Sequence, residues 1–92
     1  MQYVIDVNKD LQKAKALFEV LKQRKCKDLM TSSLECCVRN GDRPSRFYKV
    51  YESKEKGLSY VSWLDNPYNL KILSLEDFIK QQGVITLWKY LM

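Results

Sequence analysis

The repeat of apolar residues between Leu11 and Leu21 constrains the fold of this chain more than any other feature of its sequence. Apolar residues recur there at steps of three and four, which is the spacing of one face of an α-helix. The residues on this face are Leu11, Ala14, Leu17, Phe18 and Leu21, with Leu29 following less regularly. Asn8 is the expected N-cap, and Asp10 suits the positive end of the helix dipole. The sequence therefore predicts an amphipathic helix of about five turns.

Segments of alternating apolar and polar residues flank this helix, and a period of two is typical of β-strands. The segments are 2–7, 34–39, 46–52 and 58–64. The last three are separated by 40–45 and 53–57, which contain Gly, Pro, Asn, Asp and Ser as turns do. Because these connections are short, we expect the last three segments to form an antiparallel three-strand meander.

A second helix is predicted over 75–82. Ser74 is its expected N-cap, Asp77 completes a capping box, and Gly83 stands where a helix commonly ends. The run 84–91 that follows is almost unbroken in apolar residues, which favours a strand buried inside the sheet. The predicted order is β-α-β-β-β-α-β, in which two helices pack on one sheet face of an α+β fold. The expected core is Leu17, Phe18, Leu21, Phe78, Ile85 and Leu87.

Composition bounds the class of protein. The chain has 92 residues, of which 46% are hydrophobic, and this predicts one domain over 1–92. No apolar run approaches the ~20 residues that span a membrane. The first residues carry no basic leader, and the odd count of cysteines favours reduced thiols, so we expect a cytoplasmic protein without membrane contact. Richness in Lys, Ile, Tyr and Asn is typical of AT-rich coding regions, which makes a phage or mobile element one candidate source.

Histidine is absent, and this removes the usual general base for a serine or cysteine nucleophile. It also removes the commonest zinc ligand, and the three cysteines have no Cys-x-x-Cys spacing. The three glycines are isolated at 41, 57 and 83, so no glycine-rich phosphate loop is present. We therefore expect a protein that is not an enzyme and has no cofactor, no metal and no small-molecule substrate.

The excess of positive charge lies entirely in the first 56 residues. That part contains thirteen Lys and Arg against eight Asp and Glu, whereas 57–92 contains three of each kind. A basic surface on a small protein is a candidate docking face for polyanions. The Lys-rich outer side of the first helix is better explained as a solvated surface, because its opposite charges stand at ion-pair spacing.

Cationic and aromatic side chains alternate over 39–63, where the aromatics are Phe47, Tyr48, Tyr51, Tyr60 and Trp63. In sheet-based nucleic-acid readers, rings stack on bases while Arg and Lys neutralise phosphates. The residues expected to contact nucleic acid or another partner are Arg39, Arg43, Arg46, Lys49, Tyr51, Lys54 and Lys56. The sequence therefore favours a small basic module that binds nucleic acid, with DNA and RNA both open.

Alternation also predicts which side chains share a face of each strand. In 46–52, one face holds Phe47, Lys49 and Tyr51, and the other holds Arg46, Tyr48, Val50 and Glu52. In 58–64, Val61 and Trp63 lie opposite Leu58, Tyr60 and Leu64. Neither face of 46–52 is purely apolar, so we expect one aromatic-bearing face of the sheet to be partly exposed.

Two other interpretations stay open at this point. The aromatics can simply be buried under the helices while the turn lysines are ordinary solvated charges. Alternatively, the chain is a protein-interaction module, such as an inhibitor, adaptor or regulator that docks on a larger protein or on a second copy. Exposed Tyr and Trp beside Arg are typical of such interfaces. A net charge of +5 argues against an acidic mimic of DNA, and the oligomeric state is open.

The predicted element order over 9–83 is similar to that of a double-stranded-RNA-binding domain. That family presents lysines at the start of its second helix, where this chain has Leu75, Glu76 and Asp77. The two acidic residues would repel phosphate at this position. The predicted meander followed by a helix is also similar, by order only, to the DNA-binding βββα units of integrase N-terminal domains. Neither resemblance is a sequence match.

Overall fold

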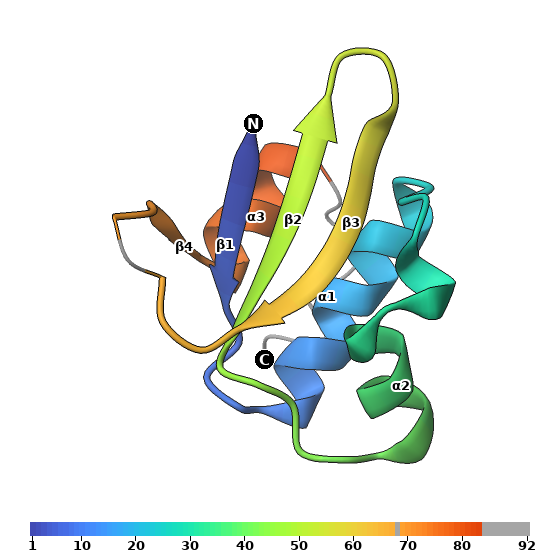
Figure 1. Cartoon of the computed structure of the whole chain (residues 1–92). Helices are drawn as coiled ribbons and strands as arrows, with labels where there is room; N and C mark the ends of the chain where they lie inside the picture. Colours follow the sequence, from blue (N-terminus) through green and yellow to red (C-terminus); the bar gives the residue numbers. More distant parts are fainter. Residues whose placement is uncertain (68, 84–92) are drawn as a thin grey trace.

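A computed structural model describes residues 1–67 and 69–83 of the chain (Figure 1). The elements in chain order are β1 (Gln2–Asp6), α1 (Leu11–Gln23), the single 3-10 turn η1 (Leu29–Thr31), α2 (Ser33–Asn40), β2 (Phe47–Ser53), β3 (Gly57–Leu64), β4 (Ile72–Ser74) and α3 (Leu75–Gln82). The fold is α+β, as predicted, but with three α-helices and a four-stranded sheet among the described residues. The predicted strand at 84–91 lies outside the described residues.

The sheet is mixed, and its strand order is β3-β2-β1-β4. β2 pairs antiparallel with both β1 and β3, whereas β4 pairs parallel with β1. The predicted hairpin of β2 and β3 is confirmed, but the predicted three-strand meander is wrong, because the third partner is the N-terminal β1. β4 pairs with β1 and not with β3, so β2, β3 and β4 do not form a meander. The sheet therefore differs from the three-strand meander of both families to which the predicted element order was similar.

The segment predicted as a strand at 34–39 is the helix α2, which is the main correction to the predicted order. The Ser32 side chain accepts a hydrogen bond from the Glu35 backbone N–H at 3.1 Å and caps the helix. Gly41 ends it in the left-handed conformation at φ 71°. Leu34 and Val38, four residues apart, lie on one side of the helix and join the core. The alternating apolar residues thus fit helical spacing as well as strand spacing.

Helix α1 is confirmed, although it is shorter than predicted and begins at a different cap. Asp10, rather than Asn8, accepts hydrogen bonds from the backbone N–H groups of Gln12 and Lys13 at 2.8 and 3.3 Å. Asn8 instead lies in a left-handed turn at φ 53°. Helix α3 has the predicted bounds and caps, with the Asp77 N–H donating to the Ser74 hydroxyl and Gly83 at φ 70°.

A bulge in β3 changes the predicted distribution of its side chains. Leu58 and Val61 are three residues apart, so strict alternation would place them on opposite faces, yet both belong to the core. The register between β2 and β3 shifts between Lys49 and Tyr51, and Tyr60 takes φ 56°. One extra residue in a strand lets both apolar side chains point the same way.

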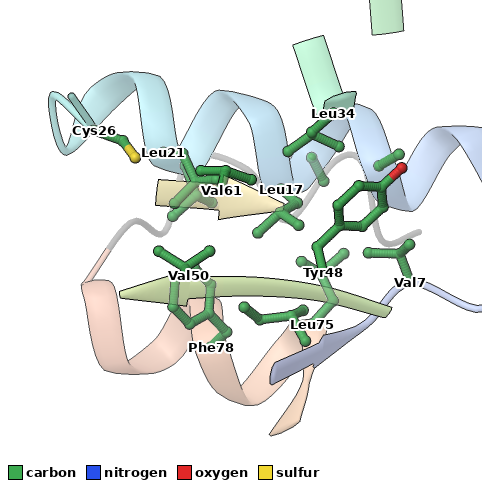
Figure 2. Close-up of a cluster of buried hydrophobic side chains, with 14 of the residues drawn as sticks. Val7, Leu17, Leu21, Cys26, Leu34, Tyr48, Val50, Val61, Leu75 and Phe78 are labelled. Carbon is green, nitrogen blue, oxygen red and sulfur yellow. The ribbon is translucent and has the colours of Figure 1, made fainter. Parts of the chain in front are cut away.

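The buried side chains form one cluster between the sheet and the helices (Figure 2). It receives residues from all three α-helices and all four strands, so the helices pack on one face of the sheet, as predicted. Of the predicted core, Leu17, Leu21 and Phe78 are fully buried and Phe18 packs against the cluster. Ile85 and Leu87 lie outside the described residues. Among the described residues, every helix is too short or too polar to cross a membrane.

Phe78 tests this packing, because its ring is fully buried and meets the Tyr3 ring edge-on at 5.5 Å. We expect Phe78→Ala to lower the free energy of unfolding by about 3–5 kcal/mol, measured by urea denaturation. Gln81→Ala, an exposed position on the same helix, is the control and should change it by less than about 0.5 kcal/mol. A loss of under about 1 kcal/mol for Phe78→Ala would contradict this account of the core.

Candidate nucleic-acid interface

The face of the sheet that points away from the helices is called the outer face. Along β2, Tyr48 and Val50 belong to the core, so the alternating residues Phe47, Lys49 and Tyr51 point to the other side. In Figure 1 α3 and α1 lie behind the strands and α2 lies below β3, so this outer face is toward the viewer. The observed packing agrees with the prediction that these three residues share a face.

Two tyrosines form the most exposed aromatic feature of the outer face. The rings of Tyr51 and Tyr60 meet at a centroid distance of 6.4 Å and an interplanar angle of 60°. Their exposed fractions are 39% and 61%. An aromatic residue rarely adopts a positive φ, so the bulge holds Tyr60 in a strained conformation. Bulges of this kind re-aim a side chain, and here the result is a ring beside Tyr51.

The middle of the outer face is closed by its own side chains. Val4 is buried and is flanked in the register by Lys49 on β2 and Ile72 on β4. Phe47 is also buried, and the Arg46 guanidinium carbon lies 5.1 Å from the centre of its ring. A cation over an aromatic face is attracted by the ring quadrupole. Val4 and Phe47 are therefore buried apolar residues of this face, and Lys49 and Arg46 lie next to them.

Basic side chains gather at both ends of β2. A groove of about 460 Å³ at its N-terminal end is lined by Lys9, Arg43 and Arg46, and we call it the basic groove. A hollow of about 700 Å³ at the opposite end is lined by Arg24 and Lys54 around Tyr51, with Glu52 as the acidic residue in its lining. Since seven residues of a strand span about 23 Å, β2 connects two cationic sites across the length of the sheet.

The structure brings together most of the predicted site residues. Lys49 and Tyr51 lie on the outer face, Arg46 borders it, and Arg43 lines the basic groove beside Arg46. Lys54 and Lys56 are exposed in the turn that joins β2 to β3. Arg39 is the exception, because it lies on α2 in the helical layer.

Arg39 and Arg46 make ion pairs with different partners, in different parts of the fold. Arg39 Nη1 lies 3.4 Å from Oε1 of Glu35, a buried carboxylate one helical turn away on α2. Arg46 Nη2 lies 3.5 Å from Asp6 Oδ2 on the neighbouring strand and stays half exposed. The pair with Asp6 holds the Arg46 guanidinium at the rim of the outer face. We therefore leave Arg39 out of the candidate site.

Three residues of this surface were missing from the predicted site. Tyr60 had a signal in the sequence, since Leu58 and Val61 can both be buried only if the strand contains a bulge. Lys9 and Arg24 had none, because each reaches the ends of β2 only through pairing between segments far apart in the chain.

Burial or hydrogen bonding raises the pKa of three ionisable groups among the described residues. Burial raises the pKa of the Tyr48 hydroxyl, which accepts a hydrogen bond from the Ser45 N–H at 3.1 Å. Burial likewise raises the pKa of the Cys26 thiol. The hydrogen bond to Glu52 is the main cause that raises the pKa of Tyr3. All three groups are thus neutral at pH 7, and none of the three supplies an anionic nucleophile. Within 1–67 and 69–83, no three Cys, Asp or Glu gather as metal ligands would.

Comparison with models of known protein families, with curated proteins and with solved structures found no match for this chain.

The strained bulge makes a prediction about stability. We expect Tyr60→Gly to leave the free energy of unfolding unchanged or to raise it by up to about 1 kcal/mol, since glycine adopts φ 56° without strain. Tyr51→Gly, on the regular strand opposite, should lower it by about 1 kcal/mol. Urea denaturation of both variants gives the comparison. Equal losses in the two variants would show that Tyr60 is not strained.

Proposed function

We propose that this protein is a non-enzymatic module that binds single-stranded nucleic acid on the outer face of its sheet. The observation that carries the proposal is the exposed pair Tyr51 and Tyr60, set between cationic side chains at both ends of β2. Bases stack on the tyrosine rings, while Arg46, Lys49 and Lys54 neutralise phosphates along the strand.

The rings favour a single strand over a duplex. A tyrosine ring can stack only on a base whose flat face is accessible, and in a duplex those faces are covered by neighbouring base pairs. The two rings lie on a sheet rather than on a projecting helix, so they suit a strand laid across the surface better than the reading of a groove. DNA and RNA share this chemistry, and the binding assay compares them directly.

The charges along β2 favour a ligand whose backbone runs along this strand. Lys49 lies midway between Arg46 and Tyr51 on the outer face, and Lys54 follows in the turn. Asp6, Glu52 and Glu55 are acidic side chains near this row. The pair of Asp6 with Arg46 reduces its repulsion of a phosphate, and Glu52 accepts a hydrogen bond from the Tyr3 hydroxyl. A backbone that follows β2 therefore meets a cation near each end and one at the middle.

Replacement of a single ring tests the stacking role. We expect Tyr51→Ala to weaken binding of a fluorescent single-stranded oligonucleotide by roughly tenfold or more, because stacking on an aromatic side chain contributes ~1–3 kcal/mol per base. Tyr51→Phe keeps the ring and should bind like the natural protein. Fluorescence anisotropy with DNA and RNA single strands and duplexes measures both. Equal affinity of the Ala and Phe variants would contradict stacking at this position.

The contribution of charge is tested by the dependence of affinity on salt. Each phosphate contact to a single strand contributes about −0.7 to the slope of log affinity against log salt, and Lys49→Ala should remove about one such contact. Lys22→Ala, an exposed lysine on α1, is the matched control and should leave the slope unchanged. Binding that does not weaken as salt rises would contradict phosphate contacts altogether.

One observation favours the second candidate function, docking on a protein. Trp63 is 52% exposed, and it pairs with Tyr48 in the register, so it lies on the helix-covered side of the sheet and away from the tyrosine pair. Exposed tryptophans are frequent anchors in protein interfaces. A partner that remains bound after nuclease treatment, and that is lost with Trp63→Ala but retained with Tyr51→Ala, would support this function instead.

A further inference from the structure

The basic groove brings together three cations from two segments that are far apart in the chain. Lys9 follows β1, whereas Arg43 and Arg46 both belong to the loop that joins α2 to β2. Asp65 is the acidic residue that lines the same groove. Within 1–67 and 69–83, neither Lys9 nor Arg43 makes an ion pair, so the groove contains three cations against the single carboxylate of Asp65.

The backbone holds these segments together. The N–H groups of Val7 and Asn8 both donate to the Arg46 carbonyl oxygen, at 2.8 and 3.2 Å. Asn8 and Lys9 then take consecutive left-handed conformations, at φ 53° and 57°. Asparagine tolerates this region, but a lysine there is strained, and such strain persists only where the surroundings impose it. The strained turn places Lys9 at the groove.

Arg46 is fixed in orientation at the boundary between the groove and the outer face. Its guanidinium pairs with Asp6 at 3.5 Å and lies over the Phe47 ring, and Phe47 also lines the groove. A guanidinium has five donors in a rigid plane, so the contact with Asp6 leaves others for a second oxyanion. A strand that follows β2 on the outer face therefore runs into the groove at its end.

We propose that the basic groove binds the terminal phosphate of the nucleic-acid strand held on the outer face, and this proposal rests on the function proposed above. A phosphate monoester at a strand end carries a charge of about −1.5 to −2 and has three acceptor oxygens. An internal diester carries one charge and has two. Three cations in one groove at the end of β2 match the monoester better, and a volume of about 460 Å³ has room for the nucleotide that bears it.

The test compares one single-stranded oligonucleotide in three forms: with a 5′-phosphate, with a 3′-phosphate, and with neither. The fluorescent label is placed at the unphosphorylated end. We expect one of the two phosphorylated forms to bind about tenfold more tightly than the unphosphorylated form, because hydrogen bonds between charged groups are strong. Both Arg43→Ala and Lys9→Gly should remove this preference. Glycine relieves the strain at φ 57°, so Lys9→Gly should keep or raise the thermal stability while the preference is lost.

Lys56→Ala, in the turn at the far end of β2, is the control and should keep the preference. If all three forms bind equally, or if both groove variants keep the preference, the terminal-phosphate site is wrong while binding on the outer face stands. If no form binds, the proposed function fails and this site fails with it.

Discussion

The one-sided packing of the sheet is the constraint on which the rest of the structure depends. All three α-helices supply their apolar side chains to the same face, and β1, in the interior of the sheet, contributes Ile5 to that core. Because every second residue of a strand points away from the helices, the outer face is an unavoidable result of this packing. Its composition is then open to selection for function, and here it contains Lys49, Tyr51 and Tyr60 rather than small polar residues alone.

Local signals in the sequence predicted the elements that depend on local interactions. The caps Ser74 and Gly83 delimit α3 as expected, and the short turn at 53–57 joins β2 to β3. The strand predicted at 34–39 failed because the apolar residues there satisfy both periods. Ser32, with Glu35 three residues later, was the deciding signal for a helix. The parallel pairing of β4 with β1 joins segments about seventy residues apart, and no local pattern specifies such a contact.

The residues of the candidate site likewise fall into those that local patterns predicted and those that only the three-dimensional fold brings together. Strand alternation was enough to predict that Lys49 and Tyr51 share a face, but which face of the sheet is exposed followed only from the packing of the helices. Arg39 was included only because its segment was taken for a strand, and on α2 it pairs with Glu35 in the helical layer. Lys9 joins Arg43 only through the pairing of β1 with β2. Residues that a fold assembles from distant segments have no common pattern in the sequence, so the groove emerged only with the topology.

The most direct measurement of the central claim is a residue-resolved NMR titration of the full chain with a short unstructured single-stranded oligonucleotide. The account predicts that the amide signals that shift most lie along β2 and β3, around Lys49, Tyr51 and Tyr60, while those of α1 and α2 change little. Shifts concentrated on the helices, or an unchanged spectrum at low salt, would contradict binding on the outer face.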